Sequence, residues 1–198
     1  MRRNKKSQTP LERPSIELLE AELKQVRYRR RYRSVLKSTV YALITVAAVA
    51  VLVATLWLPV MQTYGNSMAP TLNNGEIIFS VKTSEPSRGD VIAFYYNNKV
   101  LVKRVIAGPG DWVDIREDGT VYVNQQLLEE PYITEKSYGD ADVEFPYQVP
   151  DGRYFVLGDH RATSADSRHT AVGCVAKEQI VGRIIFRVWP MEQFGPIG

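Results

Sequence analysis

The chain has 198 residues, of which 44% are hydrophobic and 24% are charged, which suits a folded protein and argues against a disordered one. The net charge of +3 hides an asymmetry. The first 37 residues hold 12 Lys or Arg against four Glu, whereas the remainder holds 13 against 18 Asp or Glu. The excess of basic residues is therefore confined to the N-terminal arm, and the rest of the chain is net negative. No nucleic-acid partner is expected. A single cysteine, Cys174, excludes an internal disulfide but leaves the compartment open.

The N-terminal arm, residues 1–38, has two parts. Residues 1–14 are polar and are expected to be disordered. From Ser15 to Arg33, four apolar residues recur at helical spacing and predict an amphipathic helix: Ile16, Leu19, Leu23 and Val26. Such a helix can lie on an anionic membrane surface, or it can stay solvated and only set the membrane orientation. We favour the second interpretation.

An uncharged apolar run extends from Val40 to Val60. About 21 residues at about 1.5 Å each span roughly 30 Å, the thickness of a hydrocarbon core, so residues 39–60 are predicted to be a transmembrane anchor. Basic residues between Arg27 and Lys37 precede it, which predicts a cytoplasmic N-terminus and an extracytoplasmic domain in the cell membrane. A cleavable signal peptide would have a shorter apolar run and a small-residue cleavage site, and none follows Trp57.

Residues 61–198 change to short strand-like runs separated by turn residues. The expected strands are 76–82, 90–96, 100–107, 112–116, 120–123, 153–157 and 180–188. The dipeptide Asn97-Asn98 predicts a hairpin, and residues 129–150 are predicted to form a loop. Because no helical pattern interrupts these runs, the fold class is mainly β, an antiparallel sheet domain preceded by one transmembrane helix.

Ser67 and Lys103 are the clearest candidates for catalytic residues. Ser67 lies a few residues beyond the apolar run, and Lys103 lies inside a predicted strand. A serine hydroxyl becomes a useful nucleophile when a neighbouring base takes its proton, and a desolvated lysine can be that base. Lysine has a reference pKa of about 10.4, so burial among the apolar neighbours of Lys103 would have to lower it by about 3 units.

Four ordered blocks of the sequence resemble the bacterial type I signal peptidases. With Gly173 and Ile180-Val181-Gly182-Arg183, which follow at the family's spacing, they cover the chain from about Tyr64 to Arg183, and the preceding anchor also fits the family. The blocks are Gly65-Asn66-Ser67-Met68-Ala69-Pro70-Thr71-Leu72, Arg88-Gly89-Asp90-Val91-Ile92, Lys103-Arg104-Val105-Ile106-Ala107-Gly108-Pro109-Gly110-Asp111, and Gly158-Asp159-His160-Arg161 with Ser164-Ala165-Asp166-Ser167-Arg168.

The resemblance implies a role for each matching residue. Ser67 would be the nucleophile and Lys103 the general base. Ser164 would hydrogen-bond the lysine amine and orient it, Met68 would shape the turn that presents Ser67 and pack near the site, and Asp159 would belong to a supporting polar network. Three further charged residues near the site are expected to be structural: Arg104, Asp166 and Arg168.

Two residues depart from the family pattern. Gly65 stands where some members carry a serine that helps to bind the oxyanion, which leaves that task to the backbone N–H of Ser67 and a polar neighbour. His160 stands where the family usually has asparagine. A Ser67-His160-Asp159 triad is disfavoured, because adjacent side chains on an extended chain point to opposite faces.

No metal or cofactor is expected. A zinc site would have to use His160, His169 and Cys174, whose spacing matches no known ligand pattern.

The resemblance implies a membrane-bound serine endopeptidase that cleaves signal peptides from exported preproteins at Ala-x-Ala-type sites. Its partners would be these preproteins and the lipid bilayer, with the secretion translocon nearby. An alternative is a catalytically silent, membrane-tethered β domain that binds peptides or protein partners. A self-cleaving repressor would have the same pair of residues, but the anchor and the lack of a DNA-binding module argue against it. A specialised peptidase with few clients would look the same in sequence.

Overall fold

The protein is described by a computed structural model that covers residues 15–57, 59–83 and 85–197. The chain divides into two compact units, one ending at Leu52 and the other beginning at Val53. The predicted disorder of residues 1–14 lies outside the described residues.

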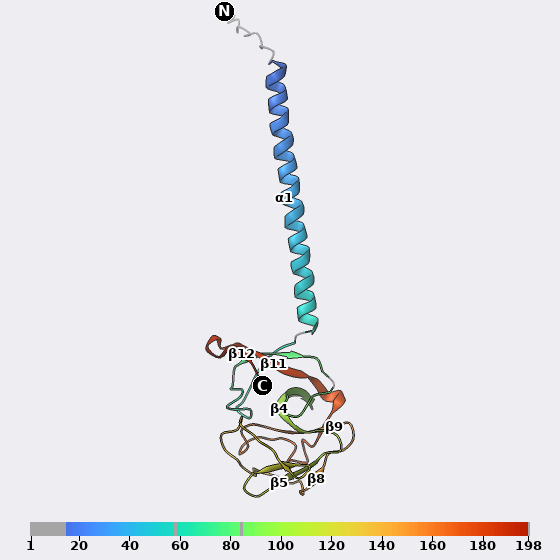
Figure 1. The fold of residues 1–198 in the computed structure, drawn as a ribbon, viewed down its shortest axis with the longest axis vertical. Coiled ribbons are helices and arrows are strands. Elements are labelled where there is room, and N and C mark those ends of the chain that lie inside the picture. Colours follow the sequence, from blue (N-terminus) through green and yellow to red (C-terminus); the bar gives the residue numbers. More distant parts are fainter. Residues whose placement is uncertain (1–14, 58, 84, 198) are drawn as a thin grey trace, which may run out of the picture. The chain divides into compact units, whose positions relative to one another are not determined.

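A single helix, α1 (Ile16–Trp57), contains both the predicted amphipathic helix and most of the predicted anchor (Figure 1). The sequence between Pro14 and Pro59 has neither glycine nor proline, so nothing in it breaks a helix. The segment Ile16–Val53 contains a stretch of mean hydropathy 2.0 with no buried side chains, which by length and composition can cross a membrane.

The helix ends earlier than the predicted end of the anchor at residue 60. Its last residue is Trp57, and Val60 is already paired with Phe79 in a sheet. Pro59 explains the difference, since it has no backbone N–H with which to continue a helix.

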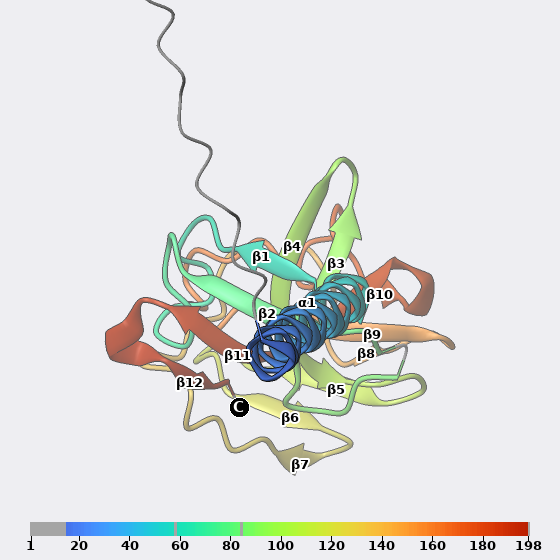
Figure 2. The same ribbon diagram turned by 90° about the horizontal axis from the view of Figure 1, so that it is seen from above.

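The C-terminal unit consists of two antiparallel sheets (Figure 2). The larger sheet has the order β1-β2-β11-β3-β4-β9-β10, with β12 paired to β11, and the smaller has the order β7-β6-β5-β8. The strands of the larger sheet are β1 (Val60–Gln62), β2 (Ile77–Val81), β3 (Val91–Tyr96), β4 (Lys99–Ala107), β9 (Arg153–Leu157), β10 (Val175–Ala176), β11 (Ile180–Trp189) and β12 (Gly195–Pro196). Those of the smaller sheet are β5 (Trp112–Ile115), β6 (Val121–Val123), β7 (Gln126–Leu127) and β8 (Tyr147–Gln148). Two short 3-10 helices are η1 (Lys177–Gln179) and η2 (Met191–Gln193).

The larger sheet is covered on both faces around β3. Successive side chains of a strand point to opposite faces. Accordingly, Val91 and Ala93 join one apolar cluster with Met68, while Ile92 and Phe94 join another. A third cluster joins the smaller sheet to β4 and β9: Ile106, Ala107, Val113, Ile115, Val121, Val123, Val149, Phe155, Leu157 and Cys174. Because apolar clusters cover both faces, polar side chains at the centre of the large sheet are shielded from water.

All seven predicted strands are present, and the predicted mainly β class is confirmed. The predicted hairpin is also present, because Tyr96 pairs with Lys99 across the two-residue turn. Asn97 has φ 50°, a left-handed conformation that asparagine tolerates better than most residues. The predicted loop of residues 129–150 contains only the two-residue strand β8 within its described length.

Candidate active site

The nucleophile candidate Ser67 lies on a tight turn between β1 and β2. The N–H of Ala69 donates to Asn66 O at 3.0 Å, and the N–H of Leu72 donates to Met68 O at 2.8 Å. Met68 and Leu72 are buried in the core at 4% and 1% exposure. The turn is therefore anchored in the core directly after Ser67, where Met68 was expected to shape it.

Glycines fit the backbone closely around Ser67. Gly65 has φ +85°, which favours glycine, and its N–H donates to Asn74 Oδ1 at 2.9 Å. On the other side, a Cβ added to Gly158 would overlap the Ser67 carbonyl and the Ser164 hydroxyl. Two residues further on, the N–H of His160 donates to Ser67 O at 3.1 Å. Gly158 thus allows two distant segments to meet behind the nucleophile, a role that its place in the Gly158-Asp159-His160-Arg161 block could have suggested.

The strand β4 carries Lys103 to Ser67. Lys103 pairs with Ile92 of β3 and is only 3% exposed. Its Nζ donates to Ser67 Oγ at 2.6 Å, so the predicted contact between the two side chains is present. A lysine amine in this position, once neutral, can accept the serine proton through the same contact.

Burial lowers the pKa of Lys103 from 10.5 to about 8. Desolvation of the ammonium is the largest cause, the positive charge of Arg168 acts in the same direction, and the carboxylates of Asp166 and Asp159 oppose it. Because the folded-state pKa is depressed, folding below about pH 8 carries the full cost of the buried ammonium. At about 1.4 kcal/mol per pKa unit this cost is about 3 kcal/mol, and it disappears as the pH rises from about 8 to 10.5.

Ser67 and Lys103 face a cleft of about 590 Å³. Its walls come from two segments, residues 61–65 on one side and residues 99–103 of β4 on the other, with Met68, Leu72 and Ile78 also lining it. The cleft is thus mainly apolar and holds the serine hydroxyl and the lysine amine side by side, the arrangement expected of a substrate site.

A buried ion pair on Asp159 links strand β4, which carries Lys103, to Thr71 in the segment that follows Ser67. Arg104 donates from Nε and Nη2 to the two carboxylate oxygens of Asp159, at 2.9 and 2.8 Å. Thr71 Oγ1 donates to the same carboxylate at 2.5 Å, and Tyr132 stacks on the guanidinium at 3.9 Å. Breaking such a pair typically costs about 3–5 kcal/mol. Sequence reasoning missed Thr71, because its pairing with Asp159 joins residues 88 positions apart.

A second buried pair closes the loop after β9. Arg168 donates from Nε and Nη2 to Asp166 at 2.9 Å in both bonds. Asp166 Oδ2 also accepts from the N–H of Gly158 at 3.0 Å, and Arg168 Nη2 donates to Arg161 O at 2.8 Å. Neither charged group is hydrogen-bonded to Ser67 or Lys103, and their charges act on the Lys103 amine without direct contact.

The hydrogen bond predicted between Ser164 and Lys103 is absent. Ser164 is 6% exposed, and its hydroxyl has no hydrogen-bond partner among the described residues. The physical reason is the direction of the Ser164 side chain. Its side chain packs against Gly158, while the lysine amine is turned to Ser67.

The alternative catalytic and metal sites are not assembled. His160 Nδ1 lies 2.7 Å from Thr163 Oγ1, while Asp159 is bound to Arg104 and Thr71, so the two do not form a triad with Ser67. Across the described ranges, no three His, Cys, Asp or Glu side chains gather as a metal site.

A serine hydroxyl that contacts a desolvated lysine amine in an apolar cleft is the arrangement of the serine hydrolases with a lysine base. Comparison with known proteins narrows this class. The family described as signal peptidase, peptidase S26, matches residues 36–189. The chain belongs to this family.

Two sequence relatives agree with this assignment, and one solved structure is also similar. Signal peptidase IB of Staphylococcus aureus (strain Mu50 / ATCC 700699) is 40% identical over 151 residues, which cover 66% of this chain and 77% of the relative. Signal peptidase I of Bacillus caldolyticus is 41% identical over 161 residues, covering 72% and 87%. A crystal structure of a signal peptidase I from Enterococcus faecalis V583 is 34% identical and covers 50% of this chain and 96% of its own, with a TM-score of 0.43. The chain is thus a membrane-anchored serine endopeptidase that processes signal peptides of exported preproteins.

Proposed function

We propose that the domain of residues 61–198 cleaves preproteins through a Ser67–Lys103 pair. Neutral Lys103 accepts the Ser67 proton as Oγ attacks the scissile carbonyl, and the same amine returns the proton to the leaving amine. Water, deprotonated by Lys103, then hydrolyses the acyl-enzyme. The observation that carries this proposal is the 2.6 Å contact between Lys103 Nζ and Ser67 Oγ inside the cleft.

The oxyanion of the tetrahedral intermediate is held by the backbone at Ser67. No hydrogen bond from the Ser67 N–H is found to any residue that the structure describes. Gly65 provides no hydroxyl, and its own N–H is engaged by Asn74. A backbone N–H next to the attacked carbonyl is a common oxyanion donor, and it needs no side chain at position 65.

The substrate is an extended peptide with small side chains. β1 pairs only with β2, and the β4 residues 99–103 pair only with β3, so within the described chain the edges of both strands that border the cleft are free. A peptide added to these edges can use its main chain for affinity, and alternate side chains then enter the cleft. Small side chains that enter the cleft in this way would fit the Ala-x-Ala pattern before a signal-peptide cleavage site.

The purified full-length protein in detergent is expected to cut a preprotein after its Ala-x-Ala sequence. Ser67→Ala should remove the cleavage, because it deletes the nucleophile, whereas Ser87→Ala on the exposed surface should keep it. The measurement is mass analysis of the products. Equal cleavage by wild type and Ser67→Ala would contradict the proposed mechanism. Peptide binding without any cleavage by wild type would instead favour a silent binding domain.

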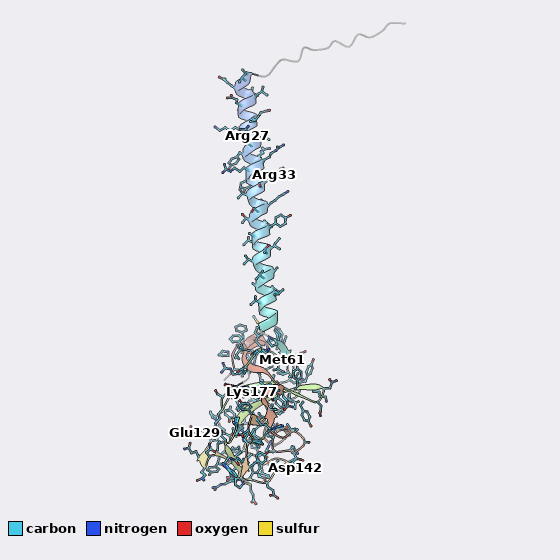
Figure 3. The ribbon with its side chains drawn as sticks, turned by 90° about the vertical axis from the view of Figure 1, so that its right-hand side faces the viewer. Arg27, Arg33, Met61, Glu129, Asp142 and Lys177 are labelled. Atoms are coloured by element: carbon cyan, nitrogen blue, oxygen red, sulfur yellow. The ribbon has the colours of Figure 1, made fainter. Side chains whose placement is uncertain are left out.

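The N-terminus is proposed to lie in the cytoplasm and the catalytic domain outside the cell membrane, close to the translocon that delivers its substrates. Arg27, Arg33 and the basic residues between them precede the apolar part of α1, and the two labelled side chains extend from the helix (Figure 3). Positive charge of this kind stays on the cytoplasmic side.

Protease added to protoplasts should therefore digest the domain after Met61 and spare a tag fused before residue 1. A lysed sample is the control for protease access to both ends. Digestion of the tag together with protection of the domain would show the opposite topology.

A further inference from the structure

The helix α1 is much longer than a bilayer requires. It contains 42 residues, and the apolar part from Val40 to Trp57 is the part suited to the membrane. The preceding residues 16–39 continue the same helix, and about 24 residues at about 1.5 Å add about 36 Å outside the hydrocarbon. To lie flat on the membrane they would need a break, yet this stretch contains no glycine or proline.

This aqueous extension carries an apolar stripe that the described chain does not cover. Ile16, Leu19, Leu23 and Val26 are 76%, 50%, 51% and 51% exposed. Their spacing of three, four and three residues is that of positions a, d, a and d in two heptads, the pattern of a coiled-coil seam.

We propose that residues 16–29 form a parallel two-stranded coiled coil with the same residues of a second copy, so that the enzyme is a dimer in the membrane. Copies anchored in one membrane enter it in one orientation, so their helices run parallel. The inference rests on the membrane anchor and is independent of the catalytic assignment.

The charges beside the stripe fit this partner. In this register Glu22 occupies position g and Arg27 position e, and in parallel coiled coils position g faces position e five residues later on the partner. The symmetric dimer therefore places Glu22 opposite Arg27 twice. Residues 16–29 contain three Glu, two Arg and one Lys, so the two segments meet without net charge. The basic residues that follow lie near the lipid headgroups, where anionic lipid can neutralise them.

Thiol crosslinking of the full-length protein in lipid vesicles, at a low protein-to-lipid ratio, tests the seam. Leu19→Cys lies on the stripe, and Leu18→Cys, 57% exposed and one residue away, lies off it. The native Cys174 is buried and serves both variants as a common background. We expect crosslinked dimer from Leu19→Cys to exceed that from Leu18→Cys by about tenfold. Equal yields from the two variants, or no dimer above the wild-type background, would overturn the coiled coil. A helix that lies on the membrane surface would give that result.

Charge exchange in the Leu19→Cys background tests register and orientation. Glu22→Arg alone and Arg27→Glu alone should each lower the crosslinked fraction several-fold, because each places like charges opposite one another. The double exchange should restore it. Loss in the singles without restoration in the double would overturn the parallel register. Preprotein cleavage in detergent should be unchanged in the two single and the double charge variants, which separates this result from any failure of the catalytic proposal.

Discussion

Replacement of Lys103 by alanine is expected to lower the rate of preprotein cleavage by about 1,000-fold or more, because Ser67 then has no base. The amine contacts Ser67 Oγ at 2.6 Å, and no other amine or imidazole is hydrogen-bonded to that oxygen among the described residues. The variant should fold, since removing the buried ammonium also removes its desolvation cost. Cleavage kinetics and thermal unfolding, measured on the same preparation, check both statements.

His160→Asn is the matched control for this prediction. The His160 ring contacts Thr163, and the link from His160 to the nucleophile is made by its backbone N–H, which asparagine retains. We therefore expect this variant to keep most of the wild-type rate. A folded His160→Asn protein without activity, together with an active Lys103→Ala protein, would move the base from Lys103 to His160.

The strands could be predicted from sequence because their apolar runs are local signals. Val91–Tyr96 and Lys99–Ala107 are both bounded by turn residues, and Asn97 suits the turn between them. The shortest strands carry no such signal. Tyr147–Gln148 and Val175–Ala176 are two residues long and exist because neighbouring strands offer them partners.

The site was accessible from sequence for a different reason. Ser67 and Lys103 are 36 residues apart, and no periodicity indicates their contact, so the prediction came from the resemblance to a family. Side-chain pairings to which the resemblance assigned no role were missed. Thr71 and Glu130 bind partners on other segments, Asp159 and Arg161, and such pairings are decided by the folded chain. The same limit explains Ser164, whose side-chain direction depends on its packing against Gly158.

The pH dependence of cleavage is expected to report the pKa of Lys103. The neutral amine is the active form, and its pKa of about 8 leaves about a tenth of the molecules active at pH 7. The value of kcat/KM should therefore rise about tenfold per pH unit below pH 8 and level off above it. With the ordinary lysine pKa of 10.5, the rise would continue to about pH 10.

The profile must be measured on wild type and on His160→Asn, with a short peptide that contains a small-residue cleavage site. An ordinary histidine titrates near pH 6.5, about 1.5 units below the limb expected for Lys103. If Lys103 is the base, both proteins share a limb near pH 8, because the desolvation that sets it comes from the burial of β4 and does not depend on residue 160. A limb near pH 6.5 that disappears in His160→Asn would assign the base to histidine. A limb that begins only above pH 10 would show that the cleft does not desolvate the amine enough to make it a base near neutral pH.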